Sequence, residues 1–283
     1  MAVAIVTDST SDVEPEKARE LGIAVVPLFV VFGDRSYRDY VELSRPEFYR
    51  KLEHEPVLPT TSQPTAPMFE EAFAPAVERG DDVLCVTISS QLSGTINAAR
   101  AAALRFEGAR IELYDSQTVA GGLGMMVLRA RELARAGAGT AAIVAALDRW
   151  RATERLYACL PDLSHLQRTG RIGRARAALG TLMKIVPVLS LKDGQVAAEA
   201  QVRTFARAQE TMLDLTLAAV PDPKAAHFVV MHTDAPHLAQ RAAEKLRERL
   251  QAEPASLEIW EAGPVIATHG GPGAVGVFVA TES

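Results

Sequence analysis

Hydroxyl side chains are concentrated in one short stretch of the chain, residues 89–95. An apolar run, 83–88, precedes it and an alanine-rich run, 97–106, follows it, which predicts a strand, a tight corner and a helix. A helix that begins at such a corner presents backbone N–H groups and the positive end of its dipole, which together favour an anion. Ser93 would add a neutral hydroxyl donor. This corner is therefore a candidate anion-binding site.

Two other segments hold polar side chains that could bind a ligand. Thr61 lies in a connection, 56–67, that is too rich in proline for regular structure. His269 lies in a glycine-rich loop between two runs that we expect to be extended. A lone histidine in such a loop is more often a structural cap than a ligand, so His269 is a candidate only in combination with other residues.

The elements that would position these residues alternate between strand and helix in the first half of the chain. We expect strands at 3–7, 23–32, 83–88 and 110–114, and helices at 15–22, 45–52, 68–80, 97–106 and 119–135. This order predicts a doubly wound parallel sheet, an α/β/α domain, whose ligands collect at the carboxyl ends of the strands. Ser9, Ser93 and Ser116 would then lie along one edge. Ser9 and Ser116 are more often caps than ligand contacts.

The second half has a different pattern. Asp193-Gly194 separates two extended runs, 186–191 and 195–202, which is a strong hairpin signal. We expect further strands at 156–160, 227–231 and 275–280, and helices at 140–153, 205–219 and 236–251. Antiparallel pairing next to helices predicts a smaller, mixed-sheet α/β domain. The predicted domains are residues 1–151 and 152–283.

Composition excludes several classes of protein. The chain has 283 residues, 48% of them hydrophobic and 23% charged, which is typical of a soluble globular protein. A net charge of −5 argues against a general nucleic-acid binder. No apolar run is long enough to span a membrane and no targeting pattern precedes the first strand, so we expect a cytoplasmic protein. Cys85 and Cys159 lie in apolar runs and are expected to be buried, reduced thiols.

An ordered set of motifs resembles the DegV family of bacterial fatty-acid-binding proteins over essentially the whole chain. The motifs are residues 5–12, 61–64, 88–95, 115–116, 170–172, 192–194 and 202–204, and His269 in its loop. The resemblance implies a two-domain fold of the dihydroxyacetone-kinase and DegV type, with a long-chain fatty acid such as palmitate inside and the second domain closing over it. It also implies that the protein is a carrier without a cofactor, not an enzyme. A separate kinase, related to dihydroxyacetone kinases, would phosphorylate the presented carboxylate to an acyl phosphate for phospholipid metabolism.

The same resemblance implies roles for individual residues. Thr61 and Ser93 are similar to the pair that binds the fatty-acid carboxylate, with His269 as a third contact. Hydroxyls suit this task because they hold a carboxylate without neutralising its charge. Residues that would support these loops are Ser62, Gly94, Thr95 and Gly270.

A basic region of the sequence could meet the kinase. From 163 to 192 there are arginines and lysines but no acidic residue, which is ordinarily a solvated surface. The alternative is a surface that docks the kinase or contacts its nucleotide phosphates, and Arg203 and Arg171 are the candidates for that role. Departures from the family pattern are Gln91, Thr169 in place of a usual glycine, and Gly270 in place of a larger residue.

Three other functions compete with the carrier. A serine hydrolase could use Ser93, but its Gly-x-Ser-x-Gly signature is broken at Gln91 and Thr95. A nucleotide-binding kinase would need a phosphate-binding glycine motif, and neither of the two common ones is present. A metalloenzyme could use His232, Asp234 and His237, but Asp234 is more often a helix cap at such a position and no further clear set of ligands is present, so we expect no metal.

Overall fold

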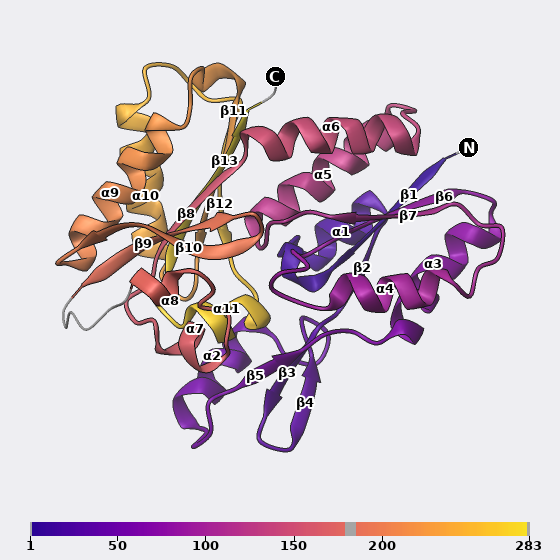
Figure 1. Cartoon of the computed structure of the whole chain (residues 1–283), viewed down its shortest axis with the longest axis horizontal. Helices are drawn as coiled ribbons and strands as arrows, with labels where there is room; N and C mark the ends of the chain where they lie inside the picture. Colours follow the sequence, from indigo (N-terminus) through magenta and orange to yellow (C-terminus); the bar gives the residue numbers. More distant parts are fainter. Residues whose placement is uncertain (1, 179–184, 282–283) are drawn as a thin grey trace. The chain divides into compact units, whose positions relative to one another are not determined.

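The computed structural model describes residues 2–178 and 185–281, which group into two compact units (Figure 1). The first unit contains residues 2–149 and a short segment from much later in the chain, Gly263–Val265. The second contains Trp150–Ala262 and residues 266–281. The sequence did not predict the return of the chain to the first unit. The division into domains 1–151 and 152–283 stays a prediction.

The first unit contains the predicted doubly wound parallel sheet. Its strands are β1 (Val3–Asp8), β2 (Ile23–Val26), β6 (Asp82–Thr87) and β7 (Ile111–Asp115), in the order β2-β1-β6-β7. Ile5 of β1 lies opposite Ile23 of β2 on one side and Leu84 of β6 on the other. The pairings of β1 with β2, β1 with β6 and β6 with β7 are all parallel. The carboxyl ends of β1, β6 and β7 are therefore neighbours, as the candidate site requires.

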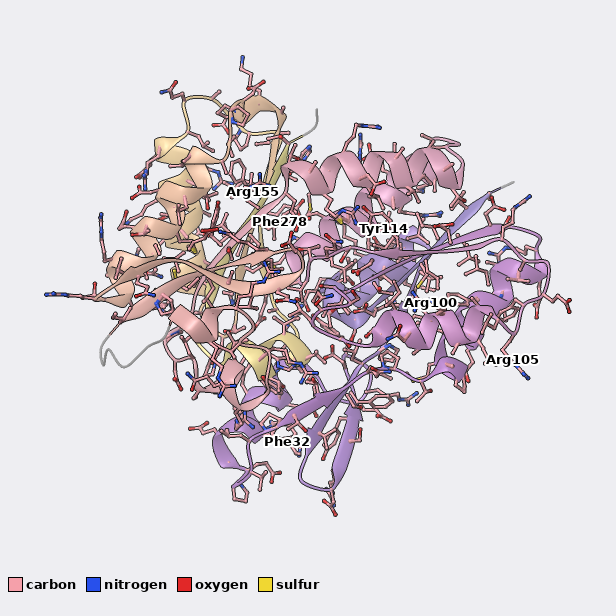
Figure 2. All side chains as sticks on the ribbon, in the orientation of Figure 1. Phe32, Arg100, Arg105, Tyr114, Arg155 and Phe278 are labelled. Carbon is pink, nitrogen blue, oxygen red and sulfur yellow. The ribbon has the colours of Figure 1, made fainter. Side chains whose placement is uncertain are left out.

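Helices pack against this sheet through apolar side chains. They are α1 (Pro15–Leu21), α3 (Ala66–Glu78), α4 (Thr95–Ala103) and α5 (Gly121–Arg135). The next helix, α6 (Thr140–Thr153), begins in the first unit, and its last residues, from Trp150 on, belong to the second. Phe69 and Phe73 of α3 share a buried cluster with Val83 and Cys85 of β6, which α4 completes with alanines. Arg100 of α4 and Arg105, which follows it, are exposed (Figure 2). The alanine-rich face of α4 is thus the face turned to the sheet.

The first unit also contains a small antiparallel sheet, in the order β4-β3-β5. Its strands are β3 (Phe29–Phe32), β4 (Arg35–Arg38) and β5 (Thr60–Ser62), and α2 (Arg45–His54) follows β4. The predicted single strand 23–32 is wrong, because Pro27 divides the run between two sheets. The prediction of irregular structure at 56–67 is also wrong in part, since the prolines flank β5 and leave its residues free to pair.

The second unit is built on a mixed sheet in the order β10-β9-β8-β13-β11-β12. Its strands are β8 (Arg155–Cys159), β9 (Val186–Lys192), β10 (Gln195–Val202), β11 (Ala226–His232), β12 (Ser256–Glu261) and β13 (Val275–Thr281). The hairpin at Asp193-Gly194 is confirmed, with both residues at positive φ. Phe278, labelled in Figure 2, is fully buried on β13. Strand β12 was not predicted.

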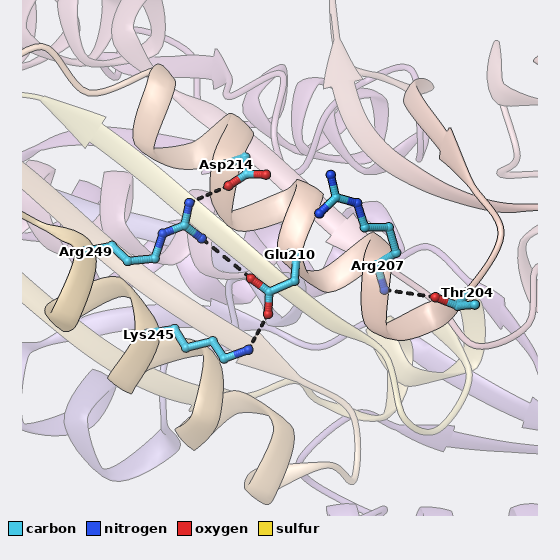
Figure 3. A network of polar contacts seen from close by, with 6 residues as sticks. All are labelled: Thr204, Arg207, Glu210, Asp214, Lys245 and Arg249. Carbon is cyan, nitrogen blue, oxygen red and sulfur yellow. Dashed lines mark hydrogen bonds and ion pairs between the residues drawn. The ribbon is translucent and has the colours of Figure 1, made fainter.

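Two long helices cover one face of this sheet, α9 (Phe205–Ala218) and α10 (Pro236–Arg249). Met212 of α9 and Leu246 of α10 are fully buried in one cluster with Phe228 of β11. Glu210 and Asp214 of α9 form ion pairs with Lys245 and Arg249 of α10 along the outer edge of this contact (Figure 3). The short helices α7 (Ser164–Arg168) and α8 (Ala175–Ala178) contribute to a separate apolar cluster with Leu189.

The predicted glycine loop around His269 is a helix, α11 (Pro264–Gly270). Ile266 and Thr268 favour an extended chain, but the residues at the two ends of the segment decide its structure. Pro264 has the φ that the first turn of a helix needs. Gly271, at φ 70°, ends the helix with its N–H bonded to the Ala267 carbonyl at 2.8 Å. His269 consequently lies in the last turn of a helix.

Two smaller expectations concern membrane segments and cysteines. In the described ranges, 2–178 and 185–281, no helix is both long and apolar enough to cross a bilayer. Cys85 and Cys159 are free and buried, as predicted. Burial raises the pKa of Cys159 to about 12, so this thiol is protonated at neutral pH.

Candidate functional site

The corner after β6 is shaped by Ser89. Its hydroxyl accepts a hydrogen bond from the Gln91 N–H at 3.2 Å, and its carbonyl accepts from the N–H groups of Leu92 and Ser93 at 3.0 and 3.1 Å. The turn ends at Gly94, the N-cap of α4, and no side chain caps this helix. Ser93 therefore lies immediately before the N-cap of α4, and the start of a helix is the arrangement that favours an anion.

Ser93 is held in place by the hydroxyl of Thr95. The two oxygens, Ser93 Oγ and Thr95 Oγ1, are 2.9 Å apart, and either one could be the donor. Thr95 is fully buried, whereas Ser93 is half-buried. The buried hydroxyl thus fixes the orientation of the more accessible one.

Asp8 attaches this corner to the end of β1. Its Oδ2 accepts a hydrogen bond from the Ile88 N–H at 2.8 Å, and its Oδ1 accepts from the Thr10 N–H at 3.0 Å and from the Thr10 hydroxyl. Burial raises the pKa of Asp8 to about 6, although these hydrogen bonds oppose the rise. In the polar run 8–12, Asp8 caps a single 3-10 turn, Ser9–Ser11, whereas α1 begins after Glu14 without a side-chain cap.

Ser9 and Ser116 bond to the backbone. The Ser9 hydroxyl accepts from the Leu28 N–H at 3.0 Å, and that of Ser116 accepts from the Thr118 N–H at 3.1 Å. Both are completely or almost completely buried. These contacts agree with the structural roles that the sequence favoured for the two serines.

Thr61 lies on β5, opposite Val30 of β3, and is half-buried. The loop that follows it reaches the Ser93 corner. A Cβ atom added to Gly94 would lie 2.2 Å from Oε1 of Gln63, so the Gln63 side chain packs directly over this glycine. The first unit therefore brings the segment of Thr61, Ser62 and Gln63 beside the corner of Ser93.

His269 belongs to the second unit, where it contacts Thr169. Its Nδ1 is 2.8 Å from Oγ1 of Thr169, and Thr169 directly follows α7. Burial, reinforced by the positive charges of Arg171 and Arg168, lowers the pKa of His269 to about 3. The imidazole is therefore neutral at neutral pH, and its neighbour Gly270 ends α11.

The two candidate arginines occupy different positions in the second unit. Arg171 is half-buried, and its guanidinium donates to the Thr169 carbonyl at 2.6 Å. Arg203 is exposed and precedes Thr204, the N-cap of α9, whose hydroxyl accepts from the Arg207 N–H (Figure 3). The basic region 163–192 includes Lys184, which lies outside the described residues.

The segment around His232 is a helix start. His232 Nδ1 accepts a hydrogen bond from the Ala235 N–H at 3.3 Å, immediately before α10. Among the described residues no group of three or more histidine, cysteine, aspartate or glutamate side chains could hold a metal ion. This hydrogen bond satisfies a backbone N–H group at the start of α10, so the position of the His232 ring is explained without a bound ligand.

Sequence reasoning missed a buried polar cluster in the first unit. Oδ1 of Asp12 accepts from the Tyr40 hydroxyl at 3.0 Å and from the Gly263 N–H at 2.9 Å. Arg45 donates to the Tyr40 hydroxyl at 2.9 Å and forms an ion pair with Glu14 at 2.7 Å. The only signal in the sequence was an aspartate at the end of a polar run, and its partners are too far along the chain to be predicted.

Comparison with known proteins identifies the family. The model of the DegV family matches residues 2–282 of the chain. The chain belongs to the DegV family. A DegV domain-containing protein of Deinococcus radiodurans is 39% identical over 284 residues, which cover 98% of both chains. Another, of Halalkalibacterium halodurans, is 37% identical over 276 residues and 97% of both chains.

Solved structures of DegV proteins have the same fold. A DegV family protein from Thermus thermophilus, described for its fatty acid binding, superposes with a TM-score of 0.93 at 35% identity over the whole of both chains. DegV of Bacillus subtilis, a fatty acid binding protein, gives a TM-score of 0.90 at 30% identity, again over both whole chains. The fold class predicted from the sequence, a parallel α/β/α sheet and a separate mixed-sheet α/β domain, is thus that of DegV proteins.

Proposed function

We propose that this chain is a cytoplasmic carrier that binds a long-chain fatty acid and presents its carboxylate to a separate kinase. The observation that supports the binding is the whole-chain similarity to the fatty-acid-binding DegV protein from Thermus thermophilus, at 35% identity and a TM-score of 0.93. An acyl tail gains about 0.8 kcal/mol for each CH₂ group removed from water, so an apolar slot would supply most of the affinity. The remaining task of the protein is to fix the head group.

Thr61 and Ser93 are the proposed head-group donors. The Gln63–Gly94 contact supports this pairing, because it keeps the loop after Thr61 beside the Ser93 corner. Ser62, Gly94 and Thr95 would hold the two hydroxyls in position, and Thr95 already contacts Ser93 at 2.9 Å. The partner of Ser93 in that contact is a hydroxyl and not a general base. This arrangement suits a residue that holds a carboxylate better than the nucleophile of a hydrolase.

His269 is the proposed third contact of the head group, with Gly270 as its supporting neighbour. This assignment rests on the family resemblance. The kinase would transfer phosphate to the carboxylate in the complex, so positioning would be this chain's contribution to the rate. Arg203 is the proposed docking residue because it is an exposed cation at the start of α9. Arg171 is the second candidate, although its guanidinium also bonds to the Thr169 carbonyl.

The test of binding is direct. Protein purified from its host is denatured, extracted and analysed by mass spectrometry, and the stripped protein is titrated with palmitate. We expect one or more long-chain fatty acids in the extract and saturable binding of the added one. Thr61→Val and Ser93→Ala should each weaken binding by roughly 5- to 30-fold, the loss of one hydrogen bond to a charged group. Ser36→Ala, at an exposed position on β4, is the matched control and should bind normally.

Absence of any acyl chain in the extract, together with no binding of palmitate, would refute the carrier. The kinase step has its own test. With a dihydroxyacetone-kinase-like partner and ATP, Arg203→Glu should lower acyl phosphate formation while leaving palmitate affinity unchanged. An unchanged rate would remove Arg203 from the docking surface without affecting the proposed binding.

A further inference from the structure

The corner before α4 is joined to the loop that follows β7. The Ser89 N–H donates to the Thr118 carbonyl at 2.9 Å, and the Ser90 N–H donates to Oδ1 of Asp115 at 3.1 Å. The same carboxylate oxygen accepts from the Gln117 N–H at 3.0 Å. Because β6 and β7 are neighbours in the parallel sheet, their loops start side by side. Asp115, the last residue of β7, thus ties the two loops together.

The backbone of the corner is fixed by hydrogen bonds inside the first unit. Each N–H group of residues 88–93 has an acceptor. The N–H groups of residues 91–93 bond to the hydroxyl or the carbonyl of Ser89, which closes a turn around that residue. The N–H groups of residues 88–90 instead reach acceptors outside the corner. The place of the turn, and of Ser93 at its end, therefore depends on these outside acceptors.

Two of the outside acceptors are carboxyl groups, and they differ in burial. Asp8 accepts from the Ile88 N–H at 2.8 Å, and both residues are buried. Asp115 is half-buried, and its partner Ser90 is exposed. Local opening of a protein begins where backbone hydrogen bonds are open to solvent. Loss of the Asp115 contact should therefore loosen the corner and leave the sheet folded.

We propose that Asp115 is a positioning residue that acts through Ser90 to hold the Ser93 hydroxyl where it donates to the fatty-acid carboxylate. The inference rests on the proposed function, in which Ser93 is a head-group donor. Asp115 and a carboxylate ligand carry like charges, so Asp115 cannot favour the head group by its charge. Its hydrogen bonds carry the role. Without them the corner samples several arrangements, and the apparent affinity falls with the fraction that can bind.

Two variants of Asp115 separate its hydrogen bonds from its charge. Asp115→Ala removes the acceptor of both N–H groups, whereas Asp115→Asn keeps an oxygen acceptor without the charge. We expect palmitate binding to weaken by roughly 3- to 10-fold in Asp115→Ala and to stay near that of the wild type in Asp115→Asn. Glu112→Ala, exposed on the same strand, is the matched control. Normal affinity of Asp115→Ala, or an equal loss in Asp115→Asn, would overturn the role of the hydrogen bonds.

A double-mutant cycle shows whether Asp115 acts through Ser93. Palmitate affinity is measured calorimetrically for Asp115→Ala, for Ser93→Ala and for the two substitutions combined. Once Ser93 is alanine there is no hydroxyl to position, so Asp115→Ala should then cost less than about twofold. The same loss in both backgrounds would overturn the proposal, since Asp115 would affect binding without Ser93.

Amide hydrogen exchange measures the order of the corner without a ligand. The Ser93 N–H bonds to the Ser89 carbonyl and not to Asp115, so it reports on the turn as a whole. Its exchange should become faster in Asp115→Ala and stay unchanged in Asp115→Asn. Equal exchange in Asp115→Ala and the wild type would overturn the inference and leave the proposed function intact. Failure of the wild type to bind palmitate would instead refute the proposed function.

Discussion

Asp12 accepts a hydrogen bond from the backbone N–H of Gly263 at 2.9 Å, across 251 positions of the sequence. Gly263 begins the segment that returns to the first unit, and the helix α11 starts at the next residue. The same carboxylate oxygen accepts from the Tyr40 hydroxyl, whose oxygen also lies against Gly263. Asp12 therefore holds, within the first unit, the residue that precedes α11, the helix whose last turn contains His269.

Removal of the Asp12 carboxyl group should destabilise the protein. In Asp12→Ala the Gly263 N–H and the Tyr40 hydroxyl lose their acceptor, and each buried unsatisfied donor costs about 1–3 kcal/mol. Asp12→Asn keeps an oxygen acceptor, and asparagine tolerates the positive φ of 52° found here. We expect a clear loss of stability in urea unfolding and faster exchange of the Gly263 amide proton for the alanine variant only. Asp34→Ala, at an exposed position, is the control. Equal stability of the alanine variant and the wild type would show that the contact does not stabilise the anchor.

The pH dependence of stability should carry the signature of buried carboxyl groups. Burial raises the pKa of Asp12 to about 7 and that of Asp8 to about 6, and it raises the pKa of Asp39 well above its usual value. The folded state then holds protons that the unfolded state has lost, so these groups stabilise at low pH and lose that contribution as pH rises through 6–7. His269 acts in the opposite direction, because its pKa is lowered to about 3, but it is a single group.

We therefore expect the free energy of unfolding to fall between about pH 4 and pH 7 and then to level off. Asp12→Asn removes one titrating group, so its unfolding free energy should fall less steeply, by up to about 1.4 kcal/mol per pH unit. The variant should equal the wild type near pH 4 and exceed it above pH 7. Urea unfolding followed by circular dichroism at several pH values measures both curves. Parallel curves would mean that Asp12 is ionised throughout the range.

Local signals in the sequence predicted local structure well. Ser44 and Glu47 form a capping box at the start of α2, where a helix was expected from residue 45, and Asp193-Gly194 forms the expected hairpin turn. These motifs succeed because a few neighbouring residues satisfy their own backbone groups. The parallel sheet could be predicted because an alternating order of strands and helices is typical of parallel α/β sheets.

Long-range contacts could not be predicted in the same way. The acceptor of the Gly263 N–H is a side chain near the start of the chain, and no periodicity in the sequence connects them. β5 forms because Thr61 finds a partner in Val30 of β3, which the local proline content hides. Thr169 was noted as a departure from the family pattern, yet its contact with His269 depends on the meeting of α11 with the residue after α7. At the candidate site, the sequence thus identified the residues but not their hydrogen-bond partners.

Ala120 occupies a backbone conformation that favours glycine. Its φ is 55° and its ψ is −135°, and its N–H bonds to the Thr10 carbonyl at 2.9 Å. A non-glycine residue in this region carries strain of about 1–3 kcal/mol. We expect Ala120→Gly to stabilise the protein, although alanine to glycine usually destabilises. Ala134→Gly, inside α5, should instead cost about 1 kcal/mol. The melting temperatures of both variants test this prediction, and a lower melting temperature for Ala120→Gly would show that Ala120 is not strained.

Gly94 couples the two proposed donor segments of the head-group site. A methyl group there would meet Gln63 Oε1 at 2.2 Å, so in Gly94→Ala the Gln63 side chain must move away from the corner. Gln63 is exposed and flexible, which keeps the cost in stability small, below about 1 kcal/mol. The loop that carries Thr61 would move with it, and we expect palmitate binding to weaken several-fold in a calorimetric titration.

A second variant separates displacement of the loop from damage to the corner itself. In Gly94→Ala combined with Gln63→Ala the added methyl group has no side chain to displace, so much of the lost affinity should return. Gly139→Ala, where nothing lies within 4 Å of an added Cβ, should bind palmitate like the wild type. If the double variant binds as weakly as Gly94→Ala, the methyl group acts on Ser93 or on the first turn of α4. The contact between Gln63 and Gly94 would then have no part in positioning Thr61.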